Sequence, residues 1–175
     1  MRIKTALVPL AIPFFLGCFA SLPPPPNREK IQAFDGRWVE QRVERNLSRR
    51  PMEVYYVYQD SNGNYLRHGT DTHYYMSGQV KMEEHYRNGL LDSITEFWHP
   101  NGNKRGELPY KDGKPHGRAV TWYPDGKKQS ETNWENGLLN GPSLEWDENG
   151  NVVKKVVWKD NRVDSATAQD STKAP

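Results

Sequence analysis

The sequence contains a single cysteine, Cys18, in 175 residues. One cysteine cannot close an intramolecular disulfide, and it cannot supply the several thiolates of a structural zinc site. The chain also lacks a dominant charge, because 24 Lys and Arg residues are set against 22 Asp and Glu residues. No run of basic residues forms a stripe, and this argues against a nucleic-acid partner.

Motifs for catalysis or nucleotide binding are absent as well. The sequence has no Gly-x-Ser-x-Gly elbow, no Walker loop and no Gly-x-Gly-x-x-Gly turn. The five histidines show no helical zinc spacing, although a hairpin could in principle bring His85 and His99 together. We therefore expect a protein that is not an enzyme and that holds no metal and no cofactor.

Long hydrophobic runs are missing too. The longest, Ala6 to Gly17, has twelve residues, and this is too short to cross a bilayer of about 30 Å. Basic Arg2 and Lys4 precede the run, and small Gly17 stands directly before Cys18. This arrangement resembles the lipobox of bacterial lipoproteins, which implies a signal peptide over 1–17 and fatty-acid (palmitate) modification of Cys18. An ordinary cleaved signal, or an unprocessed N-terminus, is the alternative.

The segments that flank the central part of the chain are polar or rich in proline. Residues 18–26 contain four successive prolines, which favour a stiff polyproline tether behind the lipidated cysteine. Phe19 is not the aspartate of inner-membrane retention, so the resemblance implies an envelope protein of the outer membrane if the organism has two membranes. Residues 165–175 are small and polar and are predicted to be a disordered tail.

The central part of the chain repeats itself every 24 residues. Glycines recur at this step, for example Gly78, Gly102, Gly126 and Gly150. Bulky aromatic residues recur at half this step, without an insertion. The aromatic series consists of Tyr74, Tyr86, Trp98, Tyr110, Trp122, Trp134, Trp146 and Trp158. A fixed period of this length predicts a repeat architecture in which each unit packs on its neighbours.

The repeat unit is predicted to be a β-hairpin. Asn-Gly and Asp-Gly dipeptides bound short segments that are rich in β-branched and aromatic residues. Helices of about eight residues between such breakers would be marginal. We predict an all-β fold: an antiparallel meander of hairpin repeats that forms one elongated, twisted sheet over residues 54–164.

Alternation along each strand sorts the side chains onto two faces. Val120 and Trp122 lie on one side of their strand, so we expect the aromatic series to form one face. The other face is expected to be charged and solvated. It should carry Glu83, Glu107 and Glu131 at one repeat position, and exposed Tyr75, His99 and Tyr123 at another. These six residues are the candidate contacts for a protein partner.

The stretch "GRAVTWYPDGKKQSETNWENGLLNG", Gly117 to Gly141, resembles the MORN-type repeat. It is similar to the bacterial variant found in a family of antitoxin components of toxin–antitoxin pairs. The unit that starts at Ser93 lacks the leading glycine, and the last unit has Lys155 and Asn161 at repeat positions of glutamate and glycine. The resemblance covers residues 54–164 and implies a scaffold more than an active site.

Residues 27–53 are ambiguous. Val39, Val43 and Leu47 have helical spacing, but Asp35-Gly36 interrupts any single helix. We favour an N-terminal strand pair that caps the first repeat, with Trp38 covering the open end of the aromatic series.

Three functions are compatible with these features. The first is an envelope-anchored repeat module that binds a protein or envelope partner. The second, implied by the resemblance, is an immunity or antitoxin-like protein that neutralises a toxin in the periplasm or at the cell surface. The third is a structural envelope protein without a specific ligand.

Overall fold

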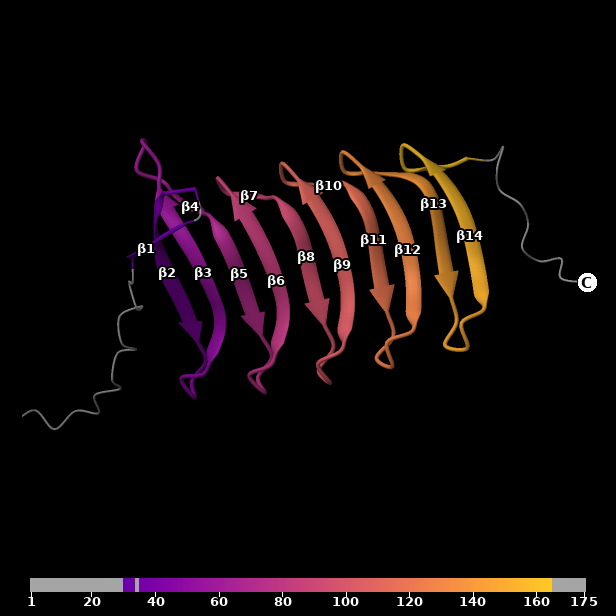
Figure 1. Cartoon of the computed structure of the whole chain (residues 1–175), viewed down its shortest axis with the longest axis horizontal. Coiled ribbons are helices and arrows are strands. Elements are labelled where there is room, and N and C mark those ends of the chain that lie inside the picture. Colours follow the sequence, from indigo (N-terminus) through magenta and orange to yellow (C-terminus); the bar gives the residue numbers. More distant parts are fainter. Residues whose placement is uncertain (1–29, 34, 165–175) are drawn as a thin grey trace, which may run out of the picture.

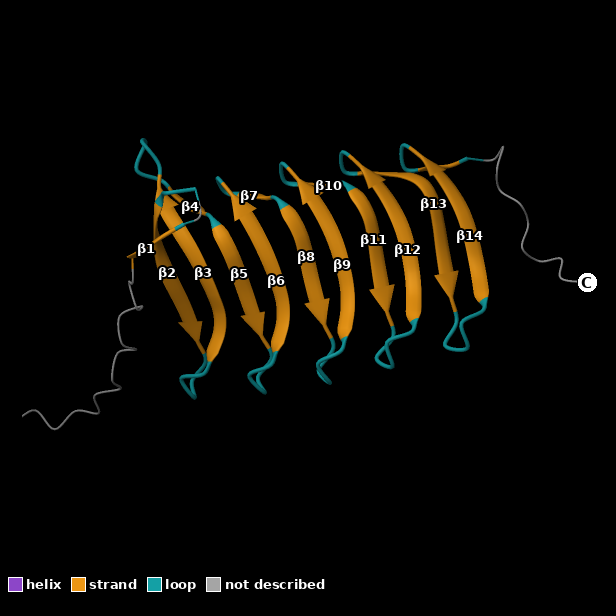
Figure 2. Ribbon diagram, in the orientation of Figure 1, coloured by secondary structure: helices purple, strands orange, loops and turns teal. Residues whose placement is uncertain are grey.

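The computed structural model describes residues 30–33 and 35–164. The predicted signal peptide, the predicted lipidation site Cys18, the predicted tether and the predicted tail lie outside these residues. Within them the chain forms one sheet of fifteen strands, all neighbours are antiparallel, and no helix occurs (Figures 1 and 2). None of the described residues therefore belongs to a helix that could cross a membrane. The predicted all-β meander of hairpin repeats is confirmed.

Fifteen strands follow one another across the sheet almost in chain order. Their bounds are β1 (Lys30–Gln32), β2 (Trp38–Arg45), β3 (Pro51–Gln59), β4 (Tyr65–Arg67), β5 (Gly69–Tyr74), β6 (Val80–Arg87), β7 (Leu90–Leu91), β8 (Ser93–Trp98), β9 (Lys104–Lys111), β10 (Lys114–Pro115), β11 (Gly117–Trp122), β12 (Lys128–Glu135), β13 (Leu138–Trp146), β14 (Val152–Lys159) and β15 (Arg162–Val163). The short strands β4, β7 and β10 pair with β3, β6 and β9, so each repeat contributes one long hairpin (Figure 1).

The two edges of the sheet use different turns. At the upper edge of Figure 1, two-residue turns such as Asn88-Gly89 and Asn136-Gly137 have positive φ at both positions. At the lower edge, the longer turns of the repeats place a single glycine, such as Gly102 or Gly126, at positive φ, and the turn between β2 and β3 places Arg49 there. Asparagine, aspartate and glycine tolerate these angles, so the dipeptides that repeat in the sequence define the turns. In the last unit Asp160-Asn161 keeps the same geometry without a glycine, with φ of 50° and 64°.

A backbone irregularity recurs in the first strand of each repeat hairpin. The residue there is Gly69, Ser93, Gly117 or Gly141, with φ between 93° and 111°. An aromatic side chain lies directly across from each of them, because Tyr86, Tyr110, Trp134 and Trp158 are their register partners. Glycine fits this conformation, whereas Ser93 adopts it with a side chain. The missing leading glycine of the second unit has therefore not changed the backbone.

The strand register overturns the predicted division into an aromatic and a charged face. Trp134 pairs with Gly117, five residues before Trp122 in β11, and an odd separation along a strand places two side chains on opposite faces. Glu131 pairs with Val120, so the glutamate lies on the face of Val120 and Trp122. Half of the aromatic series therefore shares a face with the glutamates, and the other half does not. All eight aromatic side chains are half-buried.

We name the two faces by their rows of paired residues. Face A carries Glu83, Glu96, Glu107 and Glu131, together with Tyr74, Trp98, Trp122 and Trp146. Face B carries Asp71, Thr95, Ala119 and Ser143, together with Tyr86, Tyr110, Trp134 and Trp158.

The N-terminal segment continues the sheet. β2 pairs with β3 over its whole length, and β1 adds a short edge strand, so the expected strand pair is confirmed. The expectation for Trp38 is wrong, because this side chain is 65% exposed and covers no aromatic residue of the repeats. β3 begins at Pro51, which places the expected boundary at residue 54 inside a strand.

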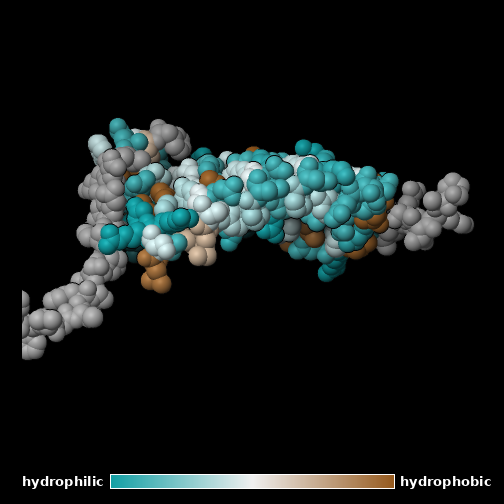
Figure 3. Space-filling model, turned by 90° about the horizontal axis from the view of Figure 1, so that it is seen from below, coloured by the Kyte–Doolittle hydropathy of each residue, from teal (hydrophilic) through white to brown (hydrophobic). Residues whose placement is uncertain are grey.

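The molecule has almost no enclosed core, because the sheet is a single layer. Val39, Val57 and Val120 are the buried apolar side chains of the described part. Viewed from the lower edge, the protein is a long slab with a mostly hydrophilic surface and small separate hydrophobic patches (Figure 3). Stability must therefore come from cross-strand pairs on both faces and from contacts between successive turns.

Candidate functional site

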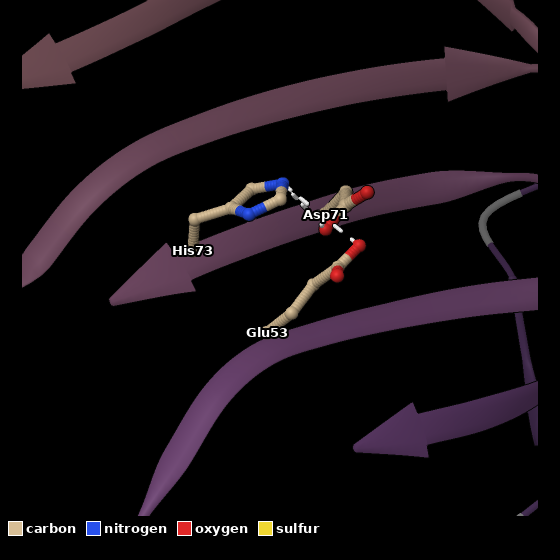
Figure 4. A group of neighbouring side chains, drawn as sticks. All are labelled: Glu53, Asp71 and His73. Atoms are coloured by element: carbon tan, nitrogen blue, oxygen red, sulfur yellow. Dashed lines mark ion pairs between the residues drawn. The ribbon is translucent and has the colours of Figure 1, made fainter. Parts of the chain in front are cut away.

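A cluster of ionisable side chains lies on face B at the N-terminal end of the repeats. Glu53 stands on β3, Asp71 and His73 stand on β5, and Glu84 stands on β6. Register pairs Glu53 with His73 and Asp71 with Glu84, so the four side chains share one face. Figure 4 shows Glu53, Asp71 and His73 pointing toward one another.

The imidazole of His73 is surrounded by carboxylates. Its Nε2 atom lies 3.5 Å from Asp71 Oδ1, 3.8 Å from Glu84 Oε2 and 3.9 Å from Glu53 Oε1. This nitrogen has no hydrogen-bond partner. One ligand atom each from Glu53, Asp71 and His73 lies within 4.8 Å of the other two.

Asp71 is the buried member of the cluster, with an exposed fraction of 1%. Arg67 forms an ion pair with it and lies 2.6 Å from Glu53 Oε1. The guanidinium contacts Asp71 Oδ2, whereas Asp71 Oδ1 accepts no hydrogen bond. A buried carboxylate in this state is costly unless a cation compensates it. The cluster thus holds three carboxylates against one guanidinium.

Two tyrosines contact members of the cluster. The Arg67 guanidinium lies over the rings of Tyr55 and Tyr86, at 4.6 and 5.5 Å from their centroids. The Tyr86 hydroxyl donates a hydrogen bond of 3.1 Å to Glu84. Burial of the ring, together with the negative charge of Glu84, raises the pKa of Tyr86 above its ordinary value.

The same positions hold other residues in the later units. Steps of 24 lead from Asp71 to Thr95, Ala119 and Ser143, and from His73 to Phe97, Thr121 and Glu145. From Glu84 they lead to Leu108, Thr132 and Val156. The hairpin therefore forms with small or apolar side chains at two of these positions, and the charged set is specific to the first unit.

Face A contains a regular arrangement of lysines, glutamates and tryptophans. Lys104 lies 2.5 Å from Glu96 and 3.1 Å from Glu107, and its ammonium lies 5.8 Å from the ring centroid of Trp122. One repeat later Lys128 lies 2.8 Å from Glu131 and 5.2 Å from the ring centroid of Trp146. The hydrogen bond to Glu96 is the main reason why the pKa of Lys104 is raised.

The predicted glutamate contacts therefore belong to this arrangement. Glu107 and Glu131 are half-buried ion-pair partners on face A, and Glu83 lies 3.7 Å from His85 on the same face. Lys128 and Arg118 hold the pKa of Glu131 below its usual range, mainly through the hydrogen bond from Lys128. The ion pairs with lysine give Glu107 and Glu131 a structural role, and partner binding through the three glutamates stays a prediction.

Tyr75, His99 and Tyr123 are not the exposed side chains that the sequence suggested. The Tyr75 hydroxyl donates to the carbonyl oxygen of Trp98 at 2.7 Å, and Tyr123 does the same to Trp146 at 2.8 Å. His99 Nε2 lies 2.9 Å from the carbonyl oxygen of Trp122. All three are half-buried and join each lower turn to the next one. This contact explains their recurrence, and partner binding through them stays a prediction.

The hypothetical pairing of His85 with His99 does not occur. His85 Nδ1 lies 3.2 Å from the carbonyl oxygen of Ile94, whereas His99 contacts Trp122 in the next unit. His68 and His116 each accept a hydrogen bond of 3.4 Å from the backbone N–H of an upper turn, at Asn88 and Asn136. These histidines are structural.

A shallow apolar depression lies on face B over the second and third units. It is centred on Gly106, which has Phe97 and Thr121 as register partners, and Leu108, Ala119 and Trp134 contribute to its walls. Gly106 is buried, and a Cβ atom there would lie 3.5 Å from both Phe97 and the Val120 carbonyl oxygen, an ordinary van der Waals distance.

Sequence reasoning missed the cluster for an identifiable reason. Asp71 and His73 lie two residues apart on one strand, so alternation could have paired them. Glu53 precedes the regular repeats, and no period gives its register. A stronger signal was the comparison of units: Asp71 departs from the small residues found 24, 48 and 72 positions later.

Comparison with known families agrees with the geometry of the repeats. The family described as "MORN repeat variant" matches residues 67–88, 91–112, 115–136 and 139–160. The four matches are in step with the 24-residue period and cover 88 of the 175 residues. No curated protein matches the chain. The hairpin register, the turns and these matches together show that the chain belongs to the family of MORN repeat variant proteins.

Proposed function

We propose that this protein is a lipid-anchored envelope protein that binds a protein partner through face B and catalyses no reaction. The observation that supports this best is the open single-layer sheet, because four repeats present two extended, accessible faces without a deep cavity in the described part. Repeat scaffolds bind through surfaces of this kind. The N-terminal sequence supports lipidation at Cys18.

Face B is the better candidate for the contact. The depression around Gly106 is lined by aromatic Phe97 and Trp134 together with the smaller Ala119 and Thr121. Aromatic residues around a small apolar area are typical of the centre of a protein interface. On face A the tryptophans instead lie beside lysine–glutamate pairs that satisfy one another.

Photo-crosslinking in the native envelope tests this proposal. A photoreactive amino acid is placed at Thr121, in the depression on face B. The matched control carries it at Arg118, three residues earlier on β11 and on face A. We expect a discrete protein adduct from Thr121 and none from Arg118. Adducts from Arg118 alone would assign binding to face A, and the absence of adducts from both positions would reject a binding module.

The anchor requires a separate experiment. Cys18→Ala should release the protein from the membrane fraction and abolish labelling by a fatty-acid analogue. Retention of the variant in the membrane would contradict lipidation. The identity of the crosslinked protein then distinguishes the finer hypotheses, because a secreted toxin would make this chain an immunity protein.

A further inference from the structure

We propose that Glu53, Asp71 and His73 form a binding site for a divalent transition-metal ion, with Glu84 as an additional ligand. The spacing of the side chains supports this. Nitrogen and oxygen ligands about 2.0–2.2 Å from an ion lie about 3.0–3.5 Å from one another. The His73 nitrogen is 3.5–3.9 Å from an oxygen of each of the three carboxylates, so small side-chain movements complete the coordination.

The state of Asp71 is an independent observation that points to a ligand. Its side chain is 1% exposed and directed into the cluster (Figure 4). Arg67 is the ion-pair partner of its Oδ2 atom, whereas its Oδ1 atom accepts no hydrogen bond. The His73 nitrogen that faces the carboxylates is also without a hydrogen bond. A metal ion among these atoms would satisfy all of them at once.

The hairpin itself does not require these charges. The third unit has Ala119, Thr121 and Thr132 where the first has Asp71, His73 and Glu84, and both units form the same hairpin. Placing a buried carboxylate in one copy alone opposes stability. A ligand that binds this copy explains why the charges are present.

Arg67 acts as the competing cation in the metal-free protein. Its guanidinium contacts both Glu53 and Asp71, but one positive charge does not balance three carboxylates. The Arg67 side chain is one-third exposed, at 34%, and can move outward when an ion enters. Binding is therefore expected to displace the Arg67–Asp71 contact.

The ligand set selects the class of ion. Imidazole together with carboxylates suits zinc or manganese, whereas magnesium and calcium prefer oxygen ligands alone. Since Zn²⁺ lies above Mn²⁺ in the general order of affinities, we expect the site to bind Zn²⁺ more tightly than Mn²⁺, and to bind Mg²⁺ only weakly.

Isothermal titration of the metal-free, full-length chain with ZnCl₂, MnCl₂ and MgCl₂ tests the proposal. We expect one Zn²⁺ per chain, an affinity about tenfold or more weaker in His73→Ala, and no change in His85→Ala on face A. Arg67→Gln should bind Zn²⁺ more tightly than the wild type, because the competing cation is gone. A role of the cluster in folding alone does not predict this gain.

Two results would overturn the site. One is the absence of stoichiometric Zn²⁺ or Mn²⁺ binding in both the wild type and Arg67→Gln. The other is binding that His73→Ala and His85→Ala leave equally intact, which would place the ion elsewhere. Circular dichroism of each variant verifies the sheet, and the expected gain in Arg67→Gln keeps the test decisive if His73→Ala folds poorly.

Discussion

The first unit, residues 67–88, and the third, residues 115–136, follow the same backbone path with different side chains on face B. In the first unit β5 and β6 bring Asp71, His73 and Glu84 together. In the third unit the equivalent residues are Ala119, Thr121 and Thr132, beside an open apolar depression. The difference separates what the hairpin needs from what one copy has added. Turns, glycines and aromatics recur, whereas the ionisable cluster does not.

The largest loss of stability is expected when the carboxylate of the first unit is introduced at the equivalent position of the third unit. Ala119→Asp places a charge on face B without an arginine beside it, so we expect the free energy of unfolding to fall by about 3 kcal/mol. Denaturant unfolding measures this loss. Ala119→Ser, which copies the fourth unit, is the control and should change stability by less than about 0.5 kcal/mol. Equal losses would show that size, not charge, is limiting at this position.

The second unit allows a stabilising substitution. Ser93 has a φ of 97° where the first and third units have glycine. Because a non-glycine residue in such a conformation costs on the order of 1–3 kcal/mol, Ser93→Gly should raise the free energy of unfolding by about 1 kcal/mol. Ser93→Ala keeps the Cβ atom and should not stabilise. A lower melting temperature in Ser93→Gly would contradict the proposed strain.

The hydrogen bond from a tyrosine to the next lower turn occurs in both units. Its removal should lower stability by a similar amount in each. Tyr75→Phe and Tyr123→Phe each remove one hydroxyl that donates to a carbonyl of the next unit. We expect each to lower the free energy of unfolding by about 1 kcal/mol. Thermal unfolding that is unchanged in both variants would mean that water replaces these bonds at no cost.

The smallest expected change in stability comes from acid, which should weaken the ion pairs of face A. Lys128 keeps the pKa of Glu131 below the ordinary value of 4.5 in the folded chain. The lowered pKa means that this stabilisation is present above pH 4.5 and is lost as the pH falls through the folded-state pKa. Glu131→Gln should therefore flatten the decline of melting temperature below pH 4.5. Identical acid profiles for both proteins would show that the pair contributes nothing.

The sequence was sufficient to predict the strands and turns, because each hairpin is determined by local signals. Asn-Gly and Asp-Gly dipeptides set the turns, and the aromatic period located the strands. The division into faces failed because the sequence does not show register. Trp122 and Trp134 occupy equivalent half-repeat slots, yet an odd offset in their pairing places them on opposite faces.

The cluster could not be predicted from period alone. Glu53 comes from β3, outside the matched repeats, and its pairing with His73 depends on an irregular connection through β4. The prediction for Tyr75 and Tyr123 failed for a related reason. Alternation indicates the face of the sheet on which a side chain leaves the backbone. It does not show that a side chain at the end of a strand reaches the next turn.

The central claim is that the first-unit cluster serves a ligand and not the fold. A single variant tests it: Asp71→Ala, His73→Thr and Glu84→Thr together install the residues of the third unit, while Arg67 keeps its pair with Glu53. The free energy of unfolding is measured by denaturant titration in metal-free buffer, with circular dichroism as the signal. We predict a value equal to or above that of the wild type, because a buried carboxylate is removed. A loss of more than about 2 kcal/mol would contradict the claim and make the cluster part of the scaffold.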